Sequence, residues 1–123
     1  MASDIQSYRD LHVWRKSMDL VEALYELTAK FPKKEEYRLT NQILRAVISI
    51  PANIAEGQRR STRKDYAKFV SIAHGSTAEV ETFLIVASRV KYVSEEEIRP
   101  HLEAAGEISR MLNALRQRLL SNG

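Results

Sequence analysis

The chain has 123 residues and a formal net charge of +3, with 44% apolar and 28% charged residues. This size and balance fit one compact domain over residues 1–123 and argue against a disordered or multidomain protein. Only four glycines and three prolines interrupt a composition rich in good helix formers, so we expect an all-α fold. The lack of cysteine excludes disulfides and thiolate metal sites.

No segment of the sequence has the pattern of a signal peptide or a membrane span. The opening residues, MASDIQSYRDLHVW, lack an apolar core, and no run approaches about eighteen consecutive apolar residues. The absence of cysteine also fits a reducing compartment. We therefore expect a soluble, cytoplasmic protein without membrane contact.

Hydrophobic spacing predicts four helices, over about residues 11–31, 35–56, 62–91 and 95–120. Asp10 is the expected N-cap of the first helix, because its carboxylate can accept a bond from a first-turn amide. The sequence FPKK ends that helix near Phe31, since proline cannot continue the amide ladder. Short connections make neighbouring helices antiparallel, which predicts an up-down-up-down four-helix bundle.

Pro51 falls inside the second predicted helix. It removes one backbone donor and its ring crowds the preceding turn, which costs about 3 kcal/mol in an ordinary helix interior. We expect a kink there, with the short polar side chains of Ser49 and Asn53 satisfying freed backbone groups. Gly57 is the expected C-terminal stop of this helix.

The third helix has a clear start and one unusual interior residue. Ser61 or Thr62 is the expected N-cap, and Asp65 stands three residues after Thr62 in a capping-box arrangement. Gly75 lies well inside the helix, where glycine costs roughly 0.5–1 kcal/mol relative to alanine. Close approach of another backbone would explain a glycine at this position.

The fourth helix is predicted from a second capping box, formed by Ser94 and Glu97. Pro100 lies early in the same helix. Two interpretations stay open, because the proline either bends the first turns or marks the point where the regular helix begins.

Two of the predicted helices carry more apolar surface than a lone bundle needs, because each has a second stripe beside its core stripe. Several large apolar side chains left in water forgo about 1.5–3 kcal/mol each, so we expect self-association. A single broad core with deeply buried central helices is the alternative. The second stripes consist of Leu44, Ile48 and Ala55 on the second helix, and Ile72, Ser76, Glu79, Phe83, Val86 and Val90 on the third.

Glu79 would be an isolated carboxylate on this apolar stripe unless another residue pairs with it. Arg45 is the candidate partner, because both side chains should point from their helices toward the same region. A partly buried pair of this kind is more often structural than catalytic.

The sequence assembles no catalytic or metal site. A di-iron bundle needs Glu-x-x-His spacing, yet none of the three histidines follows a glutamate at that distance, and no two histidines lie four residues apart. The acidic run 95–97 sits at a helix start, where carboxylates favour the positive end of the dipole without any metal. We therefore expect no enzymatic activity and no cofactor.

The positive charge is concentrated in one segment. Residues 59–68 hold five cations against Asp65, a local net charge of +4 compared with +3 for the whole chain. A solvated helix start is the simple interpretation, and a site for an anionic partner is the functional one. The five cations are Arg59, Arg60, Arg63, Lys64 and Lys68.

Two arginines of the second helix extend this segment into a predicted basic track. Arg38 and Arg45 are one heptad apart, and two more heptads lead to Arg59. Forked arginine donors and the free amides at the start of the third helix both suit phosphate. Tyr66 and Phe69 lie on the core stripe, so we expect phosphate-led binding with steep salt dependence instead of base stacking.

Two stretches are distinctive, SIPANIAEG at residues 49–57 and IAHGSTAEVE at residues 72–81. Together with DLHVWRKSMDL and ISRMLNALRQRL they resemble the four-helix-bundle proteins encoded in intervening sequences of bacterial large-subunit ribosomal RNA. The resemblance spans about residues 8–115. Arg38 departs from the pattern, because the family often has glycine there. The positions that match the pattern are Pro51, Asn53, Glu56, Gly57, Gly75, Ser76 and Glu79.

The resemblance implies an antiparallel four-helix bundle that assembles as a ring-like homopentamer. It also implies a relation to the accessory proteins of diversity-generating retroelement reverse transcriptases, which use a basic surface for nucleic acid. The implied partners are other copies of the chain, a nucleic acid with RNA favoured, and a reverse transcriptase or another protein. The alternative function is a scaffold module whose basic patch binds an acidic protein surface.

Overall fold

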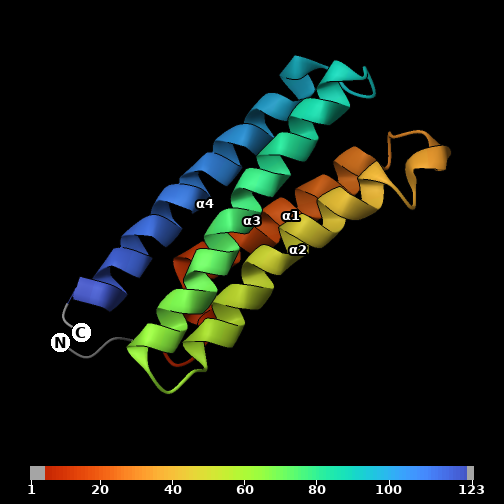
Figure 1. The fold of residues 1–123 in the computed structure, drawn as a ribbon. Helices are drawn as coiled ribbons and strands as arrows, with labels where there is room; N and C mark the ends of the chain where they lie inside the picture. Colours follow the sequence, from red (N-terminus) through yellow and green to blue (C-terminus); the bar gives the residue numbers. More distant parts are fainter. Residues whose placement is uncertain (1–4, 122–123) are drawn as a thin grey trace.

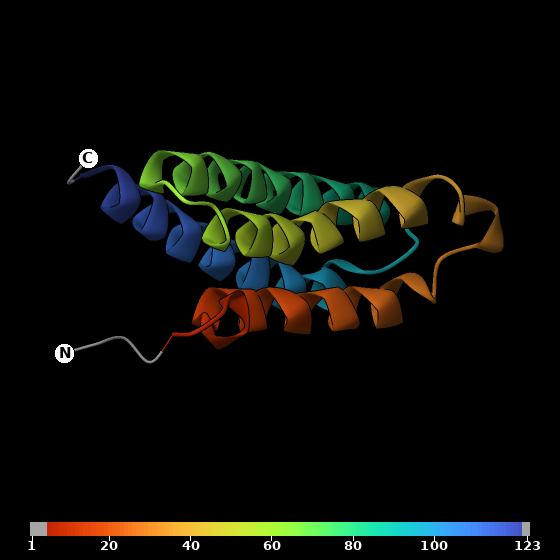
Figure 2. The ribbon, with the colours of Figure 1, turned by 90° about the horizontal axis from the view of Figure 1, so that it is seen from below.

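The structure is a computed structural model that describes residues 5–121. Successive long helices alternate in direction and pack side by side (Figures 1 and 2). α3 packs extensively against both α2 and α4. The prediction of an all-α four-helix bundle is confirmed. The elements are η1 (Tyr8–Asp10), α1 (His12–Thr28), η2 (Lys33–Glu35), α2 (Leu39–Gln58), α3 (Arg63–Arg89) and α4 (Glu95–Ser121), where η marks a short 3-10 helix.

The core is a continuous set of aliphatic side chains contributed by all four long helices. Burial of each large aliphatic side chain contributes about 1.5–3 kcal/mol relative to leaving it in water. Within residues 5–121, no helix is long and apolar enough to cross a membrane. The fully buried core includes Leu24 of α1, Ile43, Ile50 and Ile54 of α2, Val80 and Leu84 of α3, and Ile108 and Leu112 of α4.

Asp10 does not cap α1, so that prediction is wrong. Its carboxylate accepts hydrogen bonds from the backbone amides of Gln6 and Ser7, at 2.8 and 3.2 Å, and thereby closes a capping box around η1. Leu11 is the N-cap of α1 and makes no side-chain cap bond. These amide bonds to the carboxylate hold the pKa of Asp10 below its usual range.

The second helix begins at Leu39 and not near residue 35, because Glu35 has a different role. Glu35 is only 9% exposed, and its carboxylate accepts a 3.2 Å bond from the Leu39 amide and a 2.7 Å bond from the Tyr92 hydroxyl. These two donors hold the pKa of Glu35 below its ordinary value. The side chain therefore tethers the α1–α2 loop to the α3–α4 turn.

α2 continues as helix through Pro51. Asn53 donates its side-chain amide to the Ser49 carbonyl at 2.8 Å, as expected for a polar residue beside a proline. The Ser49 hydroxyl instead shares a hydrogen bond with the Ser76 hydroxyl of α3. Gly57 lies inside the helix, so its predicted role as the stop is wrong.

The predicted starts of α3 and α4 are confirmed. Thr62 accepts a bond from the Asp65 amide at 3.0 Å. Ser94 and Glu97 form the reciprocal capping box, with bonds of 2.8 and 3.0 Å. α4 already begins five residues before Pro100, so the proline lies within the helix and does not mark its start.

The glycines of α2 and α3 meet different surroundings. A Cβ atom on Gly57 would lie 2.8 Å from the Phe69 Cβ and 3.0 Å from Tyr66 Cδ1, so α2 and α3 touch where Gly57 has no side chain. A Cβ atom on Gly75 would meet nothing within 4 Å. The expected close approach of another backbone to Gly75 is therefore not made within the described chain.

We expect Gly57→Ala to lower the free energy of unfolding by about 1–3 kcal/mol, because overpacking against a Cβ atom and backbone outweighs the gain in helix propensity. Gly106→Ala is the matched control, since its Cβ would meet its neighbours at an ordinary 3.5 Å. The free energy of unfolding of the control variant should rise by about 0.5–1 kcal/mol. Urea unfolding followed by circular dichroism measures both, and equal stability of the two variants would contradict the packing role of Gly57.

Candidate nucleic-acid interface

Cations from several elements gather at the end of the bundle where α2 turns into α3. The C-terminus of α4 lies at the same end (Figure 1). We call this set of side chains the corner cluster. It consists of the five predicted cations Arg59, Arg60, Arg63, Lys64 and Lys68, together with Arg9 of η1 and Arg118 of α4.

Arg59 is directed toward the N-terminal segment. Its guanidinium carbon lies 5.6 Å from the centroid of the Tyr8 ring, and that of Arg9 lies 5.9 Å from the same ring. Tyr8 in turn contacts Trp14 edge-to-face, with 5.3 Å between the ring centroids. Cation–π attraction thus brings Arg9 to the corner cluster, an association that no local sequence pattern indicates.

Arg60 is held over α3 and beside α2. Its guanidinium carbon lies 4.6 Å from the centroid of the Phe69 ring, and it pairs with Glu56 one helical turn earlier at 2.9 Å. Both partners are largely exposed, so the ion pair contributes little to stability. The Phe69 ring therefore supports an arginine within the protein.

Arg63 ties the start of α3 to the end of α4. Its Nε donates to the Leu119 carbonyl at 3.1 Å and its Nη2 to the Arg118 carbonyl at 2.5 Å. The last carbonyls of a helix have no intrahelical donor, and a cation there also complements the dipole. The guanidinium of Arg63 therefore acts as a cap within the protein.

Lys64 and Lys68, like Arg63, are exposed cations of α3 in the corner cluster. Neither lysine makes an ion pair with any residue in the described range. Arg118 lies close to Tyr66, whose pKa is raised because burial outweighs the opposing effect of the arginine charge. Within residues 5–121, the seven cations of the cluster outnumber the nearby carboxylates of Asp10, Glu56 and Asp65.

The predicted track along α2 is spread over the length of the bundle. Arg38 precedes α2 and Arg59 follows it, so 21 residues at about 1.5 Å each separate them by roughly 31 Å. Arg45 lies between these ends and lines a hollow of about 270 Å³ with Glu79 and Phe83. Arg45 and Glu79 thus face the same space as expected, but among residues 5–121 they form no ion pair.

Part of the second apolar stripe lies in water. Ile72 and Val86 of α3 and its C-cap residue Val90 are 45%, 39% and 50% exposed. Ile48 on α2 is also exposed. Ser76 is buried in the bundle and bonded to Ser49, so it does not belong to this exposed surface. The predicted surplus of apolar helix surface is therefore real in the single chain.

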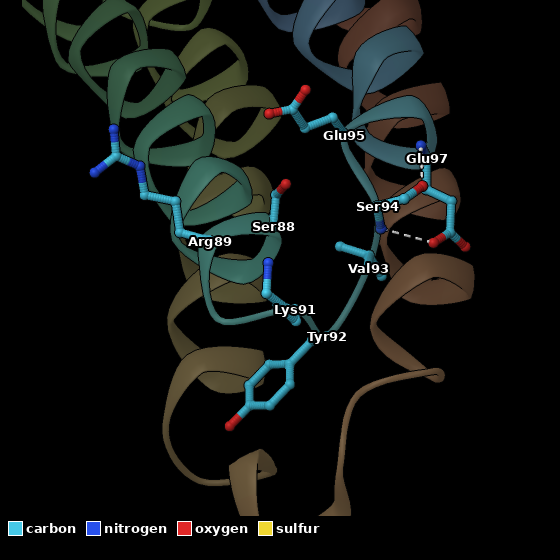
Figure 3. Close-up of a pocket in the computed structure, with 8 residues that line it drawn as sticks. All are labelled: Ser88, Arg89, Lys91, Tyr92, Val93, Ser94, Glu95 and Glu97. Carbon is cyan, nitrogen blue, oxygen red and sulfur yellow. Dashed lines mark hydrogen bonds between the residues drawn. The ribbon is translucent and has the colours of Figure 1, made fainter.

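A polar hollow of about 650 Å³ lies at the opposite end, beside the α3–α4 turn (Figure 3). The side chains of Arg89, Lys91 and Glu95 surround it, and its polar rim includes the capping box of α4. Lys91 has a positive φ of 69°, in the left-handed conformation that ends many helices. Among the described residues, no group of three or more acidic or histidine side chains could hold a metal ion.

The family model described as 23S rRNA-intervening sequence protein matches residues 9–114. The chain belongs to this family. A solved structure from Bacteroides thetaiotaomicron, described as a protein of unknown function from the S23 ribosomal protein family, is similar with a TM-score of 0.77 and 26% sequence identity. The similarity covers 85% of this chain and 98% of that one. The comparison with curated proteins gives no match.

We expect Arg63→Ala to lower the free energy of unfolding by about 1–2 kcal/mol, because the α4 carbonyls lose a charged donor that is partly exposed. Lys64→Ala is the control on the adjacent residue. Because Lys64 makes no ion pair with any residue that the structure describes, this change should alter the free energy of unfolding by less than about 0.5 kcal/mol. Chemical unfolding at one fixed protein concentration compares the variants. Equal stability of the two variants would contradict the capping role of Arg63.

Proposed function

We propose that this protein is a non-enzymatic, homo-oligomeric helical bundle that binds nucleic acid, with RNA as the favoured ligand, through the corner cluster. The observation that carries the proposal is the position of Lys64 and Lys68, exposed and without ion pairs within residues 5–121, beside arginines from η1, the α2–α3 turn and α4. The family description names a ribosomal RNA sequence, which makes RNA the first ligand to test.

The chemistry of the corner cluster suits the phosphate backbone. Lysine ammonium groups bind phosphate as point charges, and the arginines present forked donors. Arg59 and Arg60 rest on aromatic rings, so less side-chain freedom is lost when they bind. Binding through such contacts releases counterions and depends steeply on salt, with little dependence on sequence.

Self-association is supported by the exposed apolar stripe of α3. Ile72, Val86 and Val90 lie on the side of α3 that also carries Gly75, where a second backbone would meet no side chain. Copies joined through this surface would repeat the corner cluster around the assembly, so their positive potentials would add. A homopentamer is the assembly that we propose.

The double variant Lys64→Glu/Lys68→Glu should bind a labelled single-stranded RNA more weakly at every salt concentration. The slope of log affinity against log salt should also fall in magnitude by about 1.4, because two phosphate contacts are lost. Fluorescence anisotropy over a series of salt concentrations measures both. Arg99→Glu/Arg110→Glu makes the same change in charge at exposed positions of α4 and is the matched control.

An unchanged salt slope in the double variant, or equal loss of affinity in the α4 control, would reject the corner cluster as the interface. A wild-type protein that binds no RNA or DNA at low salt, but binds an acidic protein, would favour the scaffold alternative.

Val86→Glu should reduce the mass of the assembled protein, because a carboxylate would have to be buried in an apolar contact. Ile85→Glu is the control, since Ile85 is similarly exposed but points about 100° away around α3. Light scattering or native mass spectrometry reports the mass, and circular dichroism checks that the bundle stays folded. A monomeric wild-type protein, or equal masses for all three proteins, would contradict this interface.

A further inference from the structure

The α1–α2 loop lies at the end of the bundle away from the α2–α3 turn (Figure 2). It presents a highly exposed aromatic ring. Tyr37 is 86% exposed, the most of any large hydrophobic residue that the structure describes. Tyr8 lies under arginines and Tyr92 donates to Glu35, whereas Tyr25 in the last turn of α1 is half-exposed. Tyr37 is thus an aromatic face that the fold itself does not use.

Cations flank Tyr37 in the sequence. Lys33, Lys34 and Arg38 are all exposed, and none of them makes an ion pair with a residue in the range 5–121. Glu36 is the exposed carboxylate between them, since the neighbouring Glu35 is buried. The exposed part of the loop, residues 33–38, therefore carries a net positive charge around an aromatic residue.

The loop is held in place from beneath. The Phe31 side chain is buried, and its ring centroid lies 5.7 Å from that of Tyr92. Glu35 accepts hydrogen bonds from the Tyr92 hydroxyl and the Leu39 amide. Buried residues on either side of Lys33 and Lys34 fix the path of the backbone. A ligand would therefore meet a preorganised surface and lose less free energy in ordering it.

A hollow of about 390 Å³ lies next to the loop and is lined by Glu36, the residue that precedes Tyr37. Its walls include the half-exposed ring of Tyr25 together with Phe31, and Lys33 lies at its edge. Sites for small organic groups typically measure about 300–1,000 Å³ and combine apolar walls with a few polar groups. A flat, polar-edged ring fits this environment.

We infer that the α1–α2 loop is a contact site for single-stranded nucleic acid, in which Tyr37 stacks on a base and Lys33, Lys34 and Arg38 bind flanking phosphates. This inference rests on the proposed function and adds base stacking, for which the corner cluster offers no free ring. The face of a base is accessible only where a strand is unpaired, so the site selects single strands over duplexes.

The test compares Tyr37→Ala with the wild-type protein, using a labelled single-stranded RNA of mixed sequence and the same RNA in a fully paired duplex. Loss of one stacking contact should weaken single-strand binding by about 5- to 150-fold, and leave duplex binding and the salt slope unchanged. Tyr37→Phe retains the ring and should restore single-strand affinity. Ile85→Ala is the control for loss of an exposed apolar side chain elsewhere on the bundle.

Equal single-strand affinity for Tyr37→Ala and wild type would overturn the inference, while a loss of affinity in Lys64→Glu/Lys68→Glu would still support the proposed function. A parallel loss of duplex binding, or a change in assembled mass by light scattering, would also overturn it, because Tyr37 would then act on folding or on contacts between copies. If wild type binds neither single-stranded nor duplex nucleic acid, both proposals fail.

Discussion

The contact between the last turn of α2 and the first turns of α3 is the constraint on which the corner cluster depends. Gly57 lets the two helices touch at Phe69 and Tyr66, and a short turn joins the helices directly after this contact. This contact places the Phe69 ring under Arg60. Lys64 and Lys68, in the same first turns of α3, are exposed to solvent. A side chain at Gly57 would push apart the surfaces that bring these charges together.

At each end of the bundle, a charged side chain satisfies free backbone groups at a helix terminus, and the two side chains have opposite charges. At the corner, Arg63 satisfies the free carbonyls at the end of α4, and at the far end Glu35 satisfies the first amide of α2. Each tie joins elements that are far apart in sequence, because Arg63 reaches α4 and Glu35 reaches Tyr92. In both cases one charged residue is used internally, and its neighbours in the sequence are left exposed to solvent.

Because some charged residues are bonded within the fold, a run of charge in the sequence overstates the number of charges available to a ligand. Of the five cations in residues 59–68, Arg63 caps a helix and Arg60 pairs with Glu56, while Lys64 and Lys68 have no such contacts among the described residues. The fold also adds cations that the run did not include, since Arg9 shares the Tyr8 ring with Arg59. The second stripe of α3 is likewise only partly available to a partner, because its member Ser76 is buried against Ser49.

The sequence alone determined the features that depend on neighbours within one or two helical turns. Apolar spacing predicted the four helices, and Ser94 with Glu97 predicted the start of α4, because these interactions are local. The tertiary structure decided which polar side chains are hydrogen-bonded or paired within the protein and which stay free for a partner. Glu35 and Gly57 were misassigned because local patterns favour a helix and a stop, whereas contacts with Tyr92 and Phe69 set their roles. Such contacts join residues distant along the chain, so only the packed bundle brings them together.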